Sequence, residues 1–339
     1  MPRPPCPVTG TVMAGALARV AALLAIALLM GCASRPDSID TTGLASLTPH
    51  RQLDNIPYFP QIEDQCGPAS LATLLAAQGV DISAEALRGK VYIPGKEGAV
   101  TTEMIARARR YGMLTYVLRP ELSDLLMEVD AGHPVLVLQN LAFDWMPRWH
   151  FSVVVGYDLP RQTISLRSGE ELNHEIGFEL FLKIWRRADS WAMVALPAGQ
   201  LPATARRTAT LRAANDLEQV GESRAALQVY QSIIERWPDA DTAYFGAGNS
   251  AYALGQYRAS QRFFSAYLRQ QPSAAAGWNN LAYSLVALEC RSQALAAIGC
   301  AVKQAPGNPA IQESEAELRK RLPLPSTASD CPQVQCPLE

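Results

Sequence analysis

The chain has 339 residues, of which 48% are hydrophobic, and this is enough to form more than one buried core. Its 30 basic and 32 acidic residues nearly cancel, and no long basic run interleaved with aromatic residues occurs. This composition excludes nucleic acid as an expected partner and favours two soluble domains.

Residues 1–31 resemble the signal peptide of a bacterial lipoprotein. Arg3 and Arg19 precede the apolar run 20–29, which is shorter than the roughly 20 residues of a membrane span. The run leads into the tetrapeptide LMGC that ends at Cys32. It resembles a lipobox, in which the cysteine sulfur is lipidated and the chain is cleaved before it. An uncleaved anchor or an ordinary secreted protein is the alternative.

The residues after the lipobox bear on location. Ala33 and Ser34 follow Cys32, so the aspartate that signals retention in the inner membrane is absent there. The resemblance therefore implies a protein anchored by lipid to the outer membrane of a Gram-negative bacterium, facing the periplasm. Residues 32–52 are rich in Ser, Thr, Asp and Pro and are predicted to be the lipidated tether.

The seven cysteines fit an exported chain. Cys66 stands alone between Cys32 and Cys290, whereas the last four lie near the far end. In an oxidising compartment an even set of four predicts up to two disulfides, with three possible pairings, and four unpaired cysteines are the alternative. The four are Cys290, Cys300, Cys331 and Cys336.

Residues 53–196 are predicted to form an α+β domain. Helical patterns come first and short β-branched runs follow, which is typical of helices combined with an antiparallel sheet. The predicted helices are 68–78, 84–87, 101–111 and 124–129, and the predicted strands are 134–138, 151–157, 163–166 and 191–196. Residues 197–209 contain prolines and small polar residues and are predicted to be a linker.

Residues 210–320 show a repeat with a period of 34 residues, typical of tetratricopeptide repeats. Prolines recur at this spacing, and a small residue stands twelve positions before each of them: Pro238, Pro272 and Pro306, with Ala226, Ser260 and Ala294. About three repeats in an all-α solenoid are expected, followed by a Cys-containing tail at 321–339. The concave face of such a solenoid suits an extended peptide or a partner helix, and a brace that binds nothing is the alternative.

Cys66 is the candidate nucleophile. It stands at the predicted start of a helix, where free N–H groups and the helix dipole favour a thiolate. His150 is the best candidate base, because it opens a strongly predicted strand that would hold its side chain rigidly. The other three histidines, His50, His133 and His174, lie in the tether or in polar turns.

These residues carry a resemblance to the C39 cysteine peptidases, a papain-like group. It rests on 57–61, on the DQCGPASLA motif at 64–72, and on the HFSVVVGY motif at 150–157. The resemblance covers about 53–196, and its two motifs stand 84 residues apart. Together with the lipobox and the repeats, the arrangement resembles a group of Gram-negative lipoproteins with C39-like peptidase domains.

The resemblance implies a role for each matching residue. Cys66 corresponds to the nucleophile, and His150 to the base that pairs with the thiolate and then protonates the leaving amine. Gln61 corresponds to the glutamine that helps stabilise the oxyanion, although it stands five residues before Cys66 where several family members have six. Gln65 is the fallback for this role. No cofactor or metal is implied.

The sequence departs from the family pattern at the third catalytic position. Family members usually carry an Asp-Pro pair at the end of the next strand, and here the segment 167–169 reads Arg-Ser-Gly. Ser168 could orient the imidazole as a neutral group, whereas the pattern around Asp158 is more typical of a hairpin turn. A Cys–His dyad alone remains chemically competent, because thiols need less activation than hydroxyls.

The predicted function is a lipid-anchored cysteine peptidase that hydrolyses peptide bonds, with the repeats recruiting a peptide or protein substrate or partner. One alternative is a weakly active or inactive C39-like adaptor that acts as a scaffold in the cell envelope, and the missing aspartate favours it. Another alternative is acyl transfer to an amine, since the same acyl-enzyme precedes both reactions.

Overall fold

The computed structural model describes residues 43–60, 66–93, 98–321 and 331–336. The predicted lipid attachment site Cys32 and the glutamines Gln61 and Gln65 lie outside this part of the chain. Within the described residues, no helix combines the length and the apolar character that a membrane crossing requires.

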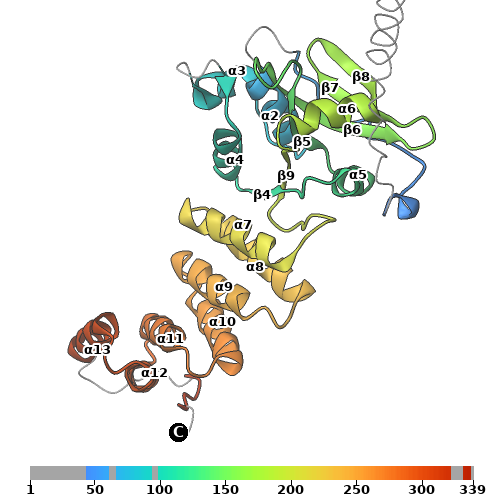
Figure 1. The fold of residues 1–339 in the computed structure, drawn as a ribbon. Helices are drawn as coiled ribbons and strands as arrows, with labels where there is room; N and C mark the ends of the chain where they lie inside the picture. The colour runs from blue at the N-terminus through green and yellow to red at the C-terminus, as the bar shows by residue number, and fades with distance from the viewer. Residues whose placement is uncertain (1–42, 61–65, 94–97, 322–330, 337–339) are drawn as a thin grey trace, which may run out of the picture. The chain divides into compact units, whose positions relative to one another are not determined.

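The first half of the chain is built on a seven-stranded antiparallel sheet (Figure 1). Six strands run in the order β4-β9-β5-β6-β7-β8, and β1 pairs with the far end of β6. A separate two-stranded sheet pairs β2 with β3. The strands are β1 His50–Gln52, β2 Tyr92–Ile93, β3 Gly98–Ala99, β4 Met113–Val117, β5 Val135–Asn140, β6 Trp149–Asp158, β7 Thr163–Ser168, β8 Glu171–Gly177 and β9 Ala192–Pro197.

Helices cover both faces of the central strands. As a result, β6 is buried from residue 151 to 157. Helix α2 packs against β5, β6, β7 and β9, whereas α6 packs against β5, β7 and β8, and Figure 1 shows these two helices on different sides of the sheet. The short 3₁₀ helix η1 precedes the sheet. These elements are η1 Leu44–Ser46, α2 Cys66–Ala76, α3 Ala84–Val91, α4 Thr101–Arg109, α5 Leu122–Asp130 and α6 Phe178–Arg186.

The predicted α+β class is confirmed, and five elements within residues 53–196 were not predicted from the sequence: the two-residue strands β2 and β3, and β4, β8 and α6. β4 is a short strand whose neighbour β9 comes about 75 residues later in the chain, so local patterning does not reveal the pairing. β8 is mostly exposed and polar, and therefore lacks an apolar alternation. α6 buries Phe181 and Trp185 but follows β8 without a polar break.

The end of the predicted tether belongs to the sheet. β1 pairs with β6 so that His50 lies opposite Asp158 and Gln52 opposite Gly156. A Cβ at Gly156 would lie 2.3 Å from Gln52 Oε1 and 2.8 Å from the carbonyl oxygen of Arg51, so only glycine permits this approach. The ordered fold therefore begins before residue 53, which is earlier than the sequence suggested.

The segment between β9 and the first repeat helix is held by a buried carboxylate. Glu128 on α5 accepts hydrogen bonds from Thr204 N at 2.8 Å, Thr204 Oγ1 at 2.6 Å and Ala203 N at 3.1 Å. It also contacts His133 Nδ1 at 2.6 Å. Burial raises the pKa of Glu128, but the hydrogen bonds from His133 and Thr204 outweigh it, and the net pKa is below the ordinary value. Ala203 and Thr204, within the predicted linker 197–209, are thus bound to α5.

The second half of the chain consists of helix pairs with a strict period. Helices α7, α9, α11 and α13 begin at Arg207, Asp241, Ala275 and Pro309, each 34 residues after the previous one. Their partners repeat with the same period, which confirms the tetratricopeptide-like fold class. The helices are α7 Arg207–Gln219, α8 Ser223–Arg236, α9 Asp241–Ala253, α10 Tyr257–Gln270, α11 Ala275–Ala287, α12 Arg291–Gln304 and α13 Pro309–Arg321.

Small residues at fixed positions let the repeat helices approach closely. A Cβ at Gly248 on α9 would lie 2.6 Å from the ring of Phe264 on α10. Ser260 is fully buried, and its hydroxyl donates to the carbonyl of Gly248 at 2.8 Å. The predicted small residues therefore fill helix–helix contacts, where a larger side chain would force the pair apart.

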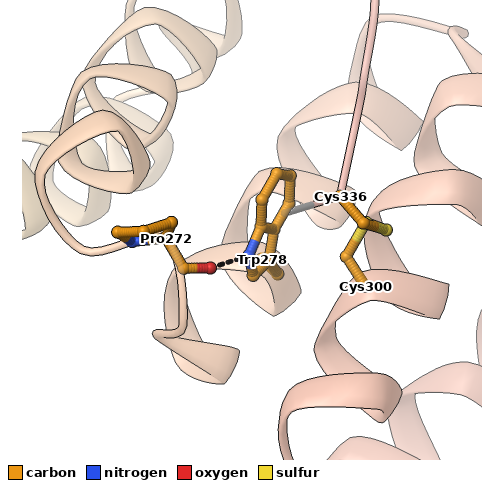
Figure 2. The surroundings of a disulfide bond; sticks show 4 residues. All are labelled: Pro272, Trp278, Cys300 and Cys336. Atoms are coloured by element: carbon orange, nitrogen blue, oxygen red, sulfur yellow. Dashed lines mark hydrogen bonds between the residues drawn. A yellow bond between two sulfur atoms is a disulfide. The ribbon is translucent and has the colours of Figure 1, made fainter. Parts of the chain in front are cut away.

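The four C-terminal cysteines form two disulfides, Cys290–Cys331 and Cys300–Cys336, with Cα–Cα distances of 5.5 and 5.4 Å. This resolves the pairing that spacing left open. Both bonds attach the tail segment 331–336 to the last helix pair. Figure 2 shows the second disulfide beside Trp278, whose indole Nε1 donates to the carbonyl of Pro272 at 2.8 Å.

Candidate active site

The first turn of α2 lies against the beginning of β6. The hydroxyl of Ser70 donates to the carbonyl oxygen of Phe151 at 3.0 Å, and both groups are buried. Cys66, the first residue of α2, precedes Ser70 by four residues and therefore lies one turn away on the same helix face. His150 directly precedes Phe151 on the strand. One buried hydrogen bond thus joins the two elements that carry the predicted nucleophile and the predicted base.

The imidazole of His150 is held by Ser168. His150 Nε2 lies 2.8 Å from Ser168 Oγ, across from β6 to the end of β7. A hydroxyl can donate or accept, so it does not fix the tautomer by itself. For Nδ1 to accept a proton, however, Nε2 must carry the ring hydrogen and donate it to Ser168. This contact leaves Nδ1 as the ring atom available to a thiol.

Burial makes the protonated ring of His150 a stronger acid than an ordinary imidazolium. Its pKa falls from the ordinary value of 6.5 to about 4, first because burial penalises the charged ring, and then because Arg148 and His174 are nearby positive groups. A neutral hydroxyl partner does not offset this penalty as a carboxylate would. The ring is therefore neutral near pH 7 and able to act as a base.

Asp158 lies at the wrong end of the strand to assist. It is eight residues after His150, which corresponds to about 26 Å along an extended strand. There it accepts a hydrogen bond from Arg161 N at 2.8 Å, as a turn residue does, and lies 3.6 Å from His50 Nδ1. Of the two residues that the sequence offered as orienting groups, Ser168 makes the contact with His150 and Asp158 does not.

The other histidines have acidic partners. His133 Nδ1 lies 2.6 Å from Glu128 Oε2, and His174 Nδ1 lies 2.9 Å from Glu171 Oε2. Together with the pair His50–Asp158, this leaves His150 as the histidine bonded to a hydroxyl. His150, chosen from the strand pattern, therefore differs from the other histidines in its surroundings, and its role as a base stays a prediction.

The segment that leads to Gln61 is attached next to Ser168. The hydroxyl of Tyr58 donates to the carbonyl of Gly169 at 3.0 Å, in the turn between β7 and β8. Burial, followed by the nearby Glu170 and Glu171, raises the pKa of Tyr58, so this phenol stays protonated. Gln61 comes three residues later. The predicted oxyanion residue itself lies outside the described part of the chain.

Gln139 is a neighbour of His150 that the sequence analysis missed. It lies directly opposite His150 in the register of β5 and β6, so both side chains emerge on one face of the sheet. The hydroxyl of Ser152 donates to Gln139 Oε1 at 2.9 Å, whereas the buried Gln139 Nε2 has no hydrogen-bond partner among the residues that the structure describes. The only signal in the sequence is a single polar residue at the end of the apolar run 134–138.

The chemistry available at this site is that of a thiol and an imidazole. Cys66 is half-buried and takes part in no disulfide. In the described ranges of the chain, His, Cys, Asp and Glu side chains form no group that could hold a metal ion. A thiol at a helix start and a neutral imidazole, on two elements joined by the Ser70–Phe151 hydrogen bond, are groups suited to covalent attack on a carbonyl carbon.

A family model agrees with this arrangement. The Peptidase_C39 like family matches residues 53–192, which contain the sheet, α2 and the His150–Ser168 pair. Among curated proteins, none matches the chain.

Solved structures resemble each half of the chain. A protein from Bacillus anthracis assigned as a C39-like peptidase is 18% identical over 43% of this chain and 97% of its own, with a TM-score of 0.38. The peptidase domain of Streptococcus ComA, a bifunctional ABC transporter involved in quorum sensing, is 20% identical over 42% and 99%, with a TM-score of 0.34. YrrB, described as a TPR protein with an unusual peptide-binding site, is 26% identical over 34% and 60%, with a TM-score of 0.32.

All three TM-scores lie below 0.5, so the assignment rests on the family model, on the α+β fold and on the 34-residue helical period. Residues 53–192 thus form an α+β domain that matches the C39-like peptidase family, and a tetratricopeptide-like helical region follows.

Proposed function

We propose that the protein is a cysteine peptidase in which Cys66 is the nucleophile and His150 the general base. The observation that carries this proposal is the Ser70–Phe151 hydrogen bond, which joins the start of α2 to the start of β6 at 3.0 Å. The contact of His150 with Ser168 supports it further, since it leaves Nδ1 of the ring for the thiol.

The proposed reaction has two steps. The Cys66 sulfur attacks the scissile carbonyl carbon while His150 takes the thiol proton, and the protonated ring then donates it to the leaving amine as the C–N bond breaks. This leaves a thioester. Water then attacks the thioester carbon and gives a proton to His150, the C–S bond breaks, and the returning proton restores the thiol. Gln61 is proposed to donate a hydrogen bond to the oxyanion in both steps.

The test is the chemical reactivity of Cys66. An ordinary thiol with a pKa near 8.5 reacts slowly at pH 6, so we expect Cys66 to react with iodoacetamide at least tenfold faster than free cysteine at this pH. Mass spectrometry of the peptide that contains Cys66 measures the rate. His150→Ala should lower the alkylation rate to that of free cysteine. The control His50→Ala changes a histidine of β1, which pairs with the opposite end of β6, and should keep the higher rate. Ordinary reactivity in the wild type would refute a catalytic Cys66 and leave the adaptor function.

The lipid anchor is part of the proposal and has its own test. The lipobox resemblance at Cys32 supports it, and the two disulfides are consistent with an oxidising compartment. Expression in a Gram-negative host with radioactive palmitate should label the wild type in the outer membrane fraction. Cys32→Ser should carry no label and appear in the soluble periplasmic fraction. A labelled Cys32→Ser protein would exclude Cys32 as the attachment site.

The repeats are proposed to recruit the substrate or a partner protein. A cavity of about 420 Å³ is lined by residues of α9, α10 and α11, namely Asn249, Tyr252, Phe264, Asn280 and Tyr283. Its amides and phenols offer hydrogen bonds, and its rings offer apolar contact, as a peptide site requires. The double variant Asn249→Ala/Tyr252→Ala should slow cleavage of unfolded casein and leave alkylation of Cys66 unchanged. Equal casein cleavage would contradict the recruiting role.

A further inference from the structure

Five large apolar side chains are exposed on the segment that joins β5 to β6, residues 141–149, which we call the apolar hairpin. A chain of this kind seldom leaves so many neighbouring apolar side chains in water unless they bind something. Their exposed fractions are 44% for Leu141, 55% for Phe143, 78% for Trp145, 56% for Met146 and 53% for Trp149.

Side-chain hydrogen bonds hold the backbone of the apolar hairpin. Asn140 Oδ1 accepts hydrogen bonds from Ala142 N at 3.1 Å and Arg148 N at 3.0 Å, which closes the base of the hairpin. Arg187 Nη1 donates to the carbonyl of Ala142 at 2.5 Å, so α6 supports it from the side. The exposed side chains are therefore presented by a fixed backbone. A surface of this kind loses little conformational entropy on binding.

Its position adjoins the candidate active site. The apolar hairpin ends at Trp149, and the next residue is the proposed base His150. Because neighbouring strands are antiparallel, β7 ends at Ser168 at the same end of the sheet, and Leu172, 49% exposed, follows at the start of β8. Exposed apolar side chains thus lie on both sides of the His150–Ser168 pair along this sheet end.

The charges and the topology favour a peptide over a lipid surface. Asp144 lies 3.8 Å from Arg187, and Arg148 is the single basic residue among the described residues 141–149, so these residues lack the cluster of basic side chains that attracts anionic lipid. The chain also enters the sheet at β1, which pairs with the opposite end of β6, about 30 Å from Trp149. The apolar hairpin is therefore far from the entry of the proposed lipid tether and close to His150.

We propose that the apolar hairpin is a substrate-binding surface that receives apolar side chains of a peptide next to the scissile bond. This rests on the proposed peptidase function and adds a substrate class, namely peptide segments rich in Leu, Phe or Val near the cleaved bond. The stacked rings of Phe143 and Trp145, with centroids 5.8 Å apart, form a flat apolar surface for such side chains.

Binding is tested separately from cleavage with the full chain carrying Cys66→Ala. The probes are two sets of fluorescein-labelled synthetic decapeptides. The four central residues are drawn from Leu, Phe and Val in the apolar set, and from Ser, Thr and Asn in the polar set. Fluorescence anisotropy measures the Kd of each peptide. The apolar peptides should bind at least tenfold more tightly. Phe143→Ser/Trp145→Ser should abolish this preference, whereas the matched control Leu180→Ser, at an exposed leucine of α6, should retain it. An unchanged preference in the double variant overturns the proposal.

Two further arms separate the possible outcomes. If Phe143→Ser/Trp145→Ser alters thermal unfolding, Met146→Ser replaces it, with the same expected loss of preference. The second arm measures binding of the protein to vesicles of phosphatidylethanolamine and phosphatidylglycerol. A hairpin variant that loses vesicle binding but keeps its preference for apolar peptides overturns the proposal. With Cys66 restored, bound peptides that are never cleaved refute the peptidase function alone. Peptides cleaved equally by wild type and hairpin variant refute the hairpin proposal alone.

Discussion

Ser168 Oγ lies 2.8 Å from Nε2 of His150, at the position where the C39 pattern leads one to expect an aspartate. The hydroxyl orients the ring but brings no negative charge. Burial therefore lowers the pKa of His150 to about 4, and within the described part of the chain no carboxylate acts on the ring to raise it again. The serine thus holds the ring of His150 in place without the charge that would favour its protonated form.

Replacing Ser168 with aspartate should strengthen the site. A carboxylate next to Nε2 favours the protonated ring, and each unit of pKa that it restores corresponds to about 1.4 kcal/mol, or tenfold in the population of the thiolate–imidazolium pair. We expect Ser168→Asp to raise the rate of Cys66 alkylation at pH 6 about tenfold. Ser168→Asn has the same size without the charge and should give no increase. Equal rates in the two variants would show that charge at this position does not limit reactivity.

The stability of the protein should fall in mild acid because of His150. Its pKa is depressed in the folded state, so the unfolded chain binds a proton below about pH 6.5 while the folded protein does so only near pH 4. This contribution is complete above pH 6.5 and is lost as the pH falls towards 4, with about 2 kcal/mol lost by pH 5. Guanidinium unfolding at pH 7 and pH 5 should show a smaller decrease for His150→Gln than for the wild type. Parallel decreases would mean that the buried ring is not a source of this dependence.

The buried carboxylate of Glu128 should be needed to hold residues 198–206. Glu128→Ala leaves the N–H groups of Ala203 and Thr204 without their acceptor, and we expect a loss of about 3 kcal/mol in the free energy of unfolding. Amide hydrogen exchange should increase in 198–206. The control Glu121→Ala removes a half-exposed partner of Arg119 and should cost less than about 1 kcal/mol. Unchanged exchange in the first variant would contradict the anchoring role of Glu128.

Two glycines in the repeats should respond to alanine with opposite signs. Gly248→Ala places a Cβ 2.6 Å from the buried ring of Phe264, so we expect destabilisation of about 1–3 kcal/mol. Gly299 lies within α12 and has open space around its Cα, so Gly299→Ala should stabilise the helix by about 0.5–1 kcal/mol. Thermal unfolding measures both. A gain at Gly248 would mean that α9 and α10 tolerate a wider separation.

Local patterns in the sequence determined much of this protein. The 34-residue spacing of prolines and small residues predicted the repeats, because each repeat makes the same contacts with its neighbours. The strand pattern around His150 and the helix start at Cys66 were likewise readable, since a strand and a helix impose periods on the residues that they bury.

Only the tertiary structure decided which distant groups meet. It selected Ser168 over Asp158 for His150, placed Gln139 opposite the same ring, and fixed the disulfide pairing. It also showed that 198–206 is bound by a buried carboxylate. Strand register and helix packing bring together residues that are far apart in the chain. Neither composition nor a local sequence pattern specifies which of these distant residues come into contact. The apolar hairpin is likewise visible as an exposed surface only because the fold leaves it uncovered next to His150.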